Sequence, residues 1–235
     1  MFDFSKKRLL VIGGTSGIGL ATAKLAASLH ADVIVASRSA DKVKAAATRI
    51  GAEGHVLDLT KTQDTEKFFA DGAPWDHIIV TGSDVSIAAV RTLDMDVAMA
   101  AMNSKFWGFY RVARAANIRP GGSLGVVAGF LATRPTAGRA LMGAINAALE
   151  SLVQGLALEL KPVRVNAVSP AVVDTEMWHG LAPEARETML KTLSEKYPAG
   201  CVASPEDIGR LLLLLAGTPY ATGTVVTMDG GASIM

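Results

Sequence analysis

The sequence predicts an α/β protein in which a parallel sheet is covered by helices on both faces. Short aliphatic runs alternate with longer helical stretches along the chain, and a glycine-rich turn directly follows the first run. Continuous aliphatic runs are typical of strands that are buried on both faces of a parallel sheet. Their alternation with helices indicates a doubly wound α/β fold.

Each element is placed by its own pattern. The expected strands are the aliphatic runs 8–12, 32–36, 54–57, 77–81, 123–128, 163–168 and 224–228. The expected helices lie between them, at 18–29, 40–49, 62–70, 95–116, 140–160 and 205–216. The most irregular stretch, 174–203, is rich in charges and is interrupted by Pro183 and Pro198. We expect it to be a substrate lid within one domain that spans residues 1–235.

The composition excludes several classes of protein. Half of the residues are hydrophobic, which excludes a disordered chain, and the net charge of +1 argues against charge-driven binding to nucleic acid. The single cysteine, Cys201, excludes a disulfide scaffold and fits a reducing compartment. The four histidines lack metal-ligand spacing, and the longest apolar run, 211–216, is far shorter than the roughly 20 residues of a membrane span. With no signal-peptide pattern at the start, we expect a cytoplasmic protein with no metal and no membrane partner.

The glycine-rich turn is a candidate phosphate-binding loop. Gly13, Gly17 and Gly19 lie between the first strand and the first helix. Glycines allow a tight turn and a close approach of the backbone to a pyrophosphate, and the helix that follows presents free N–H groups to it. The alternative is a purely structural turn, but the position after the first strand favours dinucleotide binding.

The end of the second strand bears on the choice of dinucleotide. A carboxylate there would favour NAD, but the sequence has Ser37, Arg38 and Ser39. Arg38 can meet a 2′-phosphate, which favours NADP(H), although it can also be a solvated cation at a helix start. Asp58, after the third strand, can accept from an adenine amino group or cap the helix that follows it.

These motifs resemble the short-chain dehydrogenase/reductase family along nearly the whole chain. GGTSGIG at 13–19 is similar to the glycine motif of that family, and the stretch Pro170–Thr175 is similar to its PGxxxT stretch, with Ala171 in place of glycine. The resemblance implies a three-layer Rossmann fold with a seven-stranded parallel sheet and a bound nicotinamide dinucleotide. It also implies that the stretch Pro170–Thr175 lies beside the nicotinamide, with Thr175 bonding the carboxamide. It implies that the following residues bind the cofactor: Gly13, Thr15, Ser16, Gly17, Ile18, Gly19, Ser37, Arg38, Ser39, Asp58, Leu59, Thr81, Gly82, Ser83, Pro170, Val173 and Thr175.

The usual catalytic residues of the family are replaced at the matching positions. The family uses a serine after the fifth strand, a Tyr-x-x-x-Lys pair on the next helix and an asparagine on the helix before. Here Ala128 and Gly129 stand in the serine region, and Met142 matches the tyrosine. The three tyrosines of the chain are Tyr110, Tyr197 and Tyr220, so none is near position 142. Since methionine cannot exchange a proton, the usual route of general acid catalysis is impaired.

The asparagine and lysine of the family are exchanged in this chain. Lys105 stands at the asparagine position and Asn146 at the lysine position. Asn103 is a competing match to the family's asparagine, but it is about 200° around the helix from Lys105. We expect Lys105 to reach the cofactor ribose and nicotinamide, with Asn146 bonding either its amine or the ribose hydroxyl, so both are candidate catalytic residues. The alternative is that Lys105 extends to solvent and Asn146 has no role.

Other residues are candidate proton donors, and the sequence does not choose among them. They are Thr133, Arg134, Thr136, Arg139, Glu176 and His179. The expected activity is hydride transfer between NADP(H) and a small-molecule carbonyl/alcohol pair. The alternative is an inactive relative that serves as a dinucleotide-binding sensor or as an oligomeric scaffold. Small residues in helices 95–116 and 140–160, together with the resemblance, imply a homodimer or homotetramer.

Overall fold

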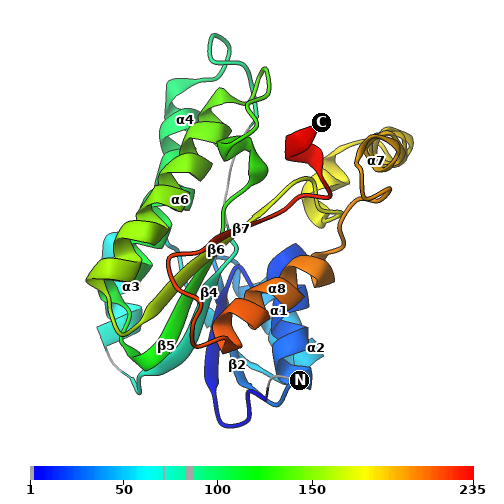
Figure 1. Cartoon of the computed structure of the whole chain (residues 1–235). Coiled ribbons are helices and arrows are strands. Elements are labelled where there is room, and N and C mark those ends of the chain that lie inside the picture. Colours follow the sequence, from blue (N-terminus) through cyan, green and yellow to red (C-terminus); the bar gives the residue numbers. More distant parts are fainter. Residues whose placement is uncertain (1–2, 71, 83–86) are drawn as a thin grey trace.

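A seven-stranded parallel sheet forms the centre of the protein (Figure 1). The structure is a computed structural model that describes residues 3–70, 72–82 and 87–235. The strand order is β3-β2-β1-β4-β5-β6-β7. The strands are β1 (Arg8–Ile12), β2 (Asp32–Ser37), β3 (Glu53–Val56), β4 (Trp75–Val80), β5 (Ile118–Val127), β6 (Arg164–Pro170) and β7 (Val225–Met228). The predicted doubly wound α/β fold is confirmed.

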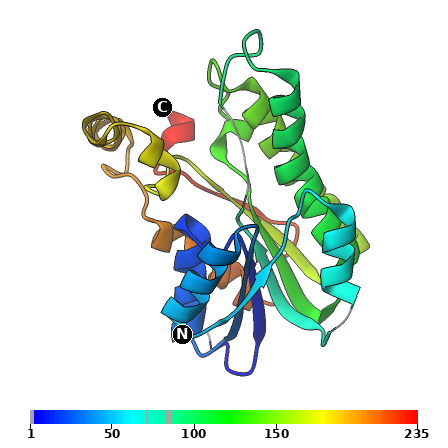
Figure 2. The same cartoon turned by 180° about the vertical axis from the view of Figure 1, so that it is seen from behind.

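Helices cover both faces of the sheet (Figures 1 and 2). Alternate residues of β1 point to opposite faces, so Leu10 and Ile12 enter one core while Leu9 and Val11 enter the other. The first core is closed by α3 (Thr62–Ala70), α4 (Met95–Met102), α5 (Gly108–Ala115) and α6 (Ala140–Glu159). The second is closed by α1 (Gly17–Ser28), α2 (Ala40–Ile50) and α8 (Pro205–Gly217).

The structure corrects two of the predicted elements. The stretch 174–203 is not irregular, because it contains α7 (Pro183–Lys196) and a short 3-10 helix, η3 (Glu176–Gly180). Pro183 begins α7 rather than interrupting a helix, since the first helical position does not need a backbone N–H. The predicted helix 95–116 is divided into α4 and α5 by a π-helical turn, Asn103–Trp107.

Helix α6 is long and apolar enough to cross a membrane by length and composition, and it is the one such helix among the described residues. In this structure its buried side chains, including Ile145, Leu149 and Val153, belong to the core beside β5 and β6. Core helices of α/β proteins commonly share this composition, because the side that faces the sheet must be apolar.

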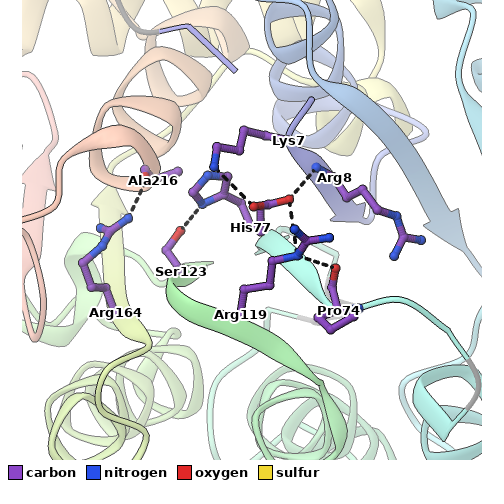
Figure 3. Close-up of polar contacts among 9 residues, drawn as sticks. Lys7, Arg8, Pro74, His77, Arg119, Ser123, Arg164 and Ala216 are labelled. Atoms are coloured by element: carbon purple, nitrogen blue, oxygen red, sulfur yellow. Dashed lines mark hydrogen bonds and ion pairs between the residues drawn. The ribbon is translucent and has the colours of Figure 1, made fainter. Parts of the chain in front are cut away.

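Polar groups link the strands at the amino-terminal edge of the sheet (Figure 3). The carboxylate of Asp76 accepts a hydrogen bond from the Arg8 backbone N–H at 3.0 Å and pairs with Lys7 and Arg119. Burial raises the pKa of Asp76, but this hydrogen bond and the two cations outweigh that effect and keep the pKa below its usual value. Asp76 therefore joins the beginnings of β1, β4 and β5.

Two more buried groups lie at this edge. His77 Nδ1 is 2.9 Å from Ser123 Oγ, and burial lowers the pKa of His77 to about 4, so the ring is neutral. The guanidinium of Arg164 donates to the carbonyls of Leu215 and Ala216 at the end of α8. Both groups have structural roles at the edge opposite to the carboxyl ends of the strands.

Replacing Asp76 with Asn should lower the free energy of unfolding at pH 7 by about 1–3 kcal/mol, because the ionised acceptor of a buried hydrogen bond is lost. The pKa of Asp76 is lowered in the folded state, so the difference in unfolding free energy between the two proteins should narrow as the pH falls below about 4, where the unfolded chain takes up the proton first. Urea unfolding at several pH values measures this. Asp32→Asn, at an exposed strand start, is the control, and an equal effect of the two variants would contradict the assigned role.

Candidate functional site

The candidate site lies at the carboxyl edge of the sheet, where the strand order reverses between β1 and β4. The backbone N–H groups of Thr81 and Gly82 both donate to the carbonyl of Ile12, at 2.9 and 3.3 Å. The loops that leave β1 and β4 therefore lie side by side. In doubly wound sheets, ligands bind in the crevice at this reversal point.

The glycine loop has no room for side chains at two of its positions. A Cβ on Gly13 would lie 2.3 Å from the Gly82 nitrogen, and one on Gly19 would lie 2.1 Å from the Gly13 carbonyl oxygen. Gly13 and Gly17 also have positive φ angles, of 84° and 47°. The loop thus has the close-packed cradle that a dinucleotide pyrophosphate needs at the start of α1. The predicted residues Thr15, Ser16 and Ile18 lie in this loop and in the first turn of α1.

The expected adenosine residues lie at the ends of β2 and β3. Ser37 ends β2, Arg38 is exposed, and Ser39 is the N-cap of α2. Arg38 and Asp58 both line a groove of about 700 Å³ along the β3 edge of the sheet. The Asp58 carboxylate accepts from the N–H and the hydroxyl of Thr60, at 3.0 and 2.7 Å.

One expectation for this region needs correction. The interpretation of Asp58 as a helix cap is wrong, because α3 begins at Thr62 and Asp58 forms a turn with Thr60 before it. The side chain of Leu59 is buried and its carbonyl accepts a hydrogen bond from Arg111, and its role at the cofactor stays a prediction. Burial raises the pKa of Asp58, but the Thr60 hydrogen bonds and the charges of Lys61 and Arg38 hold it below its usual value.

The expected nicotinamide residues follow β6. Pro170 ends the strand, Val173 is buried and pairs with Ala203, and Thr175 lies next to Gly17. Ser83, the remaining predicted cofactor residue, lies outside the described residues. The glycine loop, the β4 loop and the β6 loop are therefore adjacent at one edge of the sheet.

Lys105 and Asn146 are in direct contact beside this edge. Lys105 Nζ donates to Asn146 Oδ1 at 2.7 Å and to the carbonyl of Ala128 at 3.0 Å. Lys105 comes from the π-helical turn, Asn146 from α6, and Ala128 directly follows β5. Asn103, the competing match, is engaged elsewhere, because its amide contacts Thr60 and Arg111.

Gly129 makes room for the Asn146 side chain. A Cβ on Gly129 would lie 2.6 Å from Asn146 Nδ2, closer than van der Waals contact allows. A residue with a side chain at position 129 would therefore displace the Asn146 amide from its observed position. Met142, one turn before Asn146 on α6, is partly buried.

None of the other candidate proton donors, all of which the structure describes, is hydrogen-bonded to Lys105. The side chains of Thr133, Arg134, Thr136 and His179 are exposed, and Arg139 is partly buried before α6. Glu176 contacts the glycine loop instead, where its carboxylate accepts from the Gly17 N–H at 2.8 Å.

Comparisons with known proteins assign the chain to a family. The family model described as enoyl-(acyl carrier protein) reductase matches residues 13–233. The short-chain dehydrogenase/reductase ATR9 of Stachybotrys chlorohalonatus is 30% identical over 95% of this chain and 96% of its own. The protein ucsE of an Acremonium species, with the same family description, is 31% identical over 97% of this chain and 96% of its own. The chain belongs to the short-chain dehydrogenase/reductase family.

Solved structures of this family agree with the fold. A small-chain dehydrogenase in complex with NADPH is similar to this short-chain dehydrogenase/reductase with a TM-score of 0.87. The two are 34% identical, and the alignment covers 98% of this chain and 100% of that chain. The predicted family membership and the Rossmann-type architecture are therefore confirmed.

In this short-chain dehydrogenase/reductase, burial and a nearby carboxylate set the pKa of the Lys105 amine. Burial lowers the pKa of Lys105 to about 8, and the negative charge of Glu150 opposes part of this shift. Glu150 is one turn beyond Asn146 on α6, so both side chains lie on the same face of the helix. Its carboxylate is held by the hydroxyl of buried Ser169, at 2.8 Å. The amine can therefore both hold and release a proton near neutral pH.

Three features of the site have no clear signal in the sequence. They are the π-helical turn that carries Lys105, the Ser169–Glu150 contact and the Glu176–Gly17 contact. The two contacts join residues that are distant in the sequence, and the π-helical turn is a local change of helix geometry.

Replacing Glu150 with Gln should lower the pKa of Lys105 below about 8, because a negative charge that favours the ammonium form is removed. NMR titration of protein with ¹³C-labelled lysine measures this pKa, and Lys105→Met assigns the resonance. Glu159→Gln, at the exposed end of the same helix, should leave it unchanged. An unchanged pKa in Glu150→Gln would show that Glu150 does not influence the amine.

Proposed function

We propose that this protein is an NADP(H)-dependent oxidoreductase for a carbonyl/alcohol pair, in which Lys105 and Asn146 act in place of the usual Ser, Tyr and Lys set. The observation that carries the proposal is the contact of the Lys105 amine with Asn146 Oδ1 and the Ala128 carbonyl at the carboxyl edge of the sheet. The similarity to a dehydrogenase in complex with NADPH supports the choice of cofactor.

The residues at the crevice fit a dinucleotide. A side chain at Gly13 or Gly19 would collide with neighbouring backbone atoms. Glycine at these positions therefore allows the tight turn and close helix packing that a dinucleotide-binding loop requires. Thr15, Ser16, Gly17 and Ile18 would hold the pyrophosphate. Ser37, Arg38, Ser39, Asp58 and Leu59 would hold the adenosine end, and Thr81, Gly82, Ser83, Pro170, Val173 and Thr175 the nicotinamide end. When bound, the nicotinamide supplies the hydride that reduces a carbonyl.

In this proposal Lys105 provides the proton. Its ammonium group stabilises negative charge on a substrate oxygen and donates a proton from Nζ, which a pKa of about 8 makes possible near neutral pH. Asn146 Oδ1 and the Ala128 carbonyl hold the amine in place. Because Gly129 has no side chain, Asn146 can keep this position.

A second candidate function is a dinucleotide-binding sensor or scaffold without turnover. The presence of Met142, a side chain that cannot exchange a proton, at the position matched to the family's tyrosine favours it. Titration of NADPH by fluorescence, followed by a panel of carbonyl substrates, separates the two functions. Oxidation of NADPH with any carbonyl supports the enzyme. Tight binding without oxidation supports the sensor, and an absence of binding contradicts both.

We also propose that the protein forms a homodimer or homotetramer through α4, α5 and α6. Large apolar side chains on these helices and on the π-helical turn between α4 and α5 are exposed, including Met95, Met99, Trp107 and Leu158. Exposed apolar groups of this size are typical of interaction surfaces. Residues 174–203 form the lid of a single domain in this proposal, and a cytoplasmic location stays a prediction.

Lys105→Met should reduce the turnover of a carbonyl substrate at least about 100-fold, because the proton donor is lost. In the unaltered protein, the rate of carbonyl reduction should fall as the pH rises through about 8, since the ammonium form is then depleted. The pH dependence of kcat measures this. Lys44→Met, on the exposed face of α2, is the control, and full activity of Lys105→Met would contradict the assigned role.

Arg38→Asp should shift the cofactor preference from NADPH toward NADH by about tenfold or more. A carboxylate accepts from ribose hydroxyls and repels a 2′-phosphate. The ratio of the two Kd values, from fluorescence titration, measures this. Arg49→Asp makes the same change of charge at the end of α2 and should leave the ratio unchanged. An unchanged ratio in Arg38→Asp would refute the assigned role of Arg38.

A further inference from the structure

The lid of this protein contacts the phosphate-binding loop through a carboxylate. Glu176, the first residue of η3, accepts a hydrogen bond from the Gly17 N–H through Oε2, at 2.8 Å. Gly17 is the first residue of α1, and its N–H is one of the donors that a helix leaves without an internal partner. Ser16, the N-cap residue, makes no side-chain capping bond. Glu176 therefore supplies a side-chain acceptor to the first turn of α1, whereas Ser16 supplies none.

This contact lies where the proposed dinucleotide would place its pyrophosphate. The N–H groups and the partial positive charge at the start of α1 suit one anionic group. A carboxylate and a pyrophosphate at the same donors repel each other and compete for the same hydrogen bonds. Thr175 is also close, since a Cβ on Gly17 would lie 3.1 Å from Thr175 Cγ2. The start of the lid thus lies directly on the loop.

The lid is organised so that this contact can open without disturbing the core. Its two ends are joined, because Val173 pairs with Ala203 and the Asp174 N–H donates to the Ala203 carbonyl at 3.0 Å. Within it, Trp178 Nε1 donates to the Val173 carbonyl at 2.9 Å. All residues of η3 and α7 are described, and none of them is buried. Figures 1 and 2 show this segment above α1 and α8, outside the layers of the sheet and helices.

We propose that Glu176 is an autoinhibitory contact that occupies the pyrophosphate position and must be displaced when a dinucleotide binds. This inference rests on the proposed dinucleotide binding. Displacement of Glu176 releases the beginning of the lid, including Thr175, which the family resemblance places at the nicotinamide. Entry of the cofactor and rearrangement of the lid are thereby coupled through a single carboxylate.

The test compares NADPH binding by the unaltered full chain, Glu176→Gln and Glu176→Ala, with fluorescence titration for Kd and stopped-flow mixing for the association rate. Both variants should bind NADPH about three- to tenfold more tightly, with faster association, because a competing anion is removed from the helix terminus. Glu184→Gln, in the exposed first turn of α7, makes a matched change of lid charge and should have no effect. Adenosine 2′-monophosphate lacks the pyrophosphate, so its Kd should be the same for all four proteins.

Each outcome is decisive. Equal or weaker NADPH binding by both Glu176 variants overturns the inference while leaving dinucleotide binding intact. An equal gain for adenosine 2′-monophosphate, or for Glu184→Gln, also overturns it, because the effect is then general electrostatics. If the unaltered protein and the variants all fail to bind NADPH and NADH, the proposed function itself fails. Thermal unfolding of each variant checks that the exposed substitutions leave the fold intact.

Discussion

The close approach of the loops that leave β1 and β4 is the constraint on which the site depends. At this point the order of strands reverses, and Gly13 lies so near the Gly82 backbone that it cannot carry a side chain. The same packing places Gly19, in the first turn of α1, against the Gly13 carbonyl. The start of α1 is thereby fixed at the carboxyl edge of the sheet, together with the N–H groups of its first turn that have no partner within the helix. A bulkier residue at these points would push the helix away from the sheet and remove the crevice.

A second constraint is the enclosed amine of Lys105. A cation that is removed from water is costly unless acceptors surround it, and here the Ala128 carbonyl and the Asn146 amide oxygen serve this purpose. These acceptors come from the end of β5 and from α6, while the lysine comes from the π-helical turn. Three elements are thus joined by the two hydrogen bonds of one amine, and Gly129 leaves space for the Asn146 side chain. The absence of a side chain at position 129 is therefore what allows the Asn146 amide to occupy its place beside Lys105.

The two ends of the site have opposite electrostatic requirements. The start of α1 is a place for an anion, and the lid supplies one through Glu176. The region around Lys105 holds a cation, whose charge is favoured by Glu150 on the same face of α6 as Asn146. Both carboxylates act at a distance in sequence from the groups that they influence, and both are positioned by packing. The chemistry of the site is therefore set as much by these two acids as by the residues of the recognisable motifs.

The sequence by itself determined the fold and the location of the glycine-rich loop. Aliphatic runs buried on both faces, such as 8–12 and 77–81, follow from a local pattern, and glycine spacing identifies a turn that only glycine permits. It also placed Lys105 and Asn146 at exchanged positions, although it could not show that their side chains meet. It missed α7, because Pro183 marks either the interruption of a helix or its first residue. The tertiary structure alone decided the contacts of Lys105 with Asn146, Glu150 with Ser169 and Glu176 with Gly17. Contacts of this kind depend on how separate elements pack, and a local pattern of residues contains no information on the distance between them.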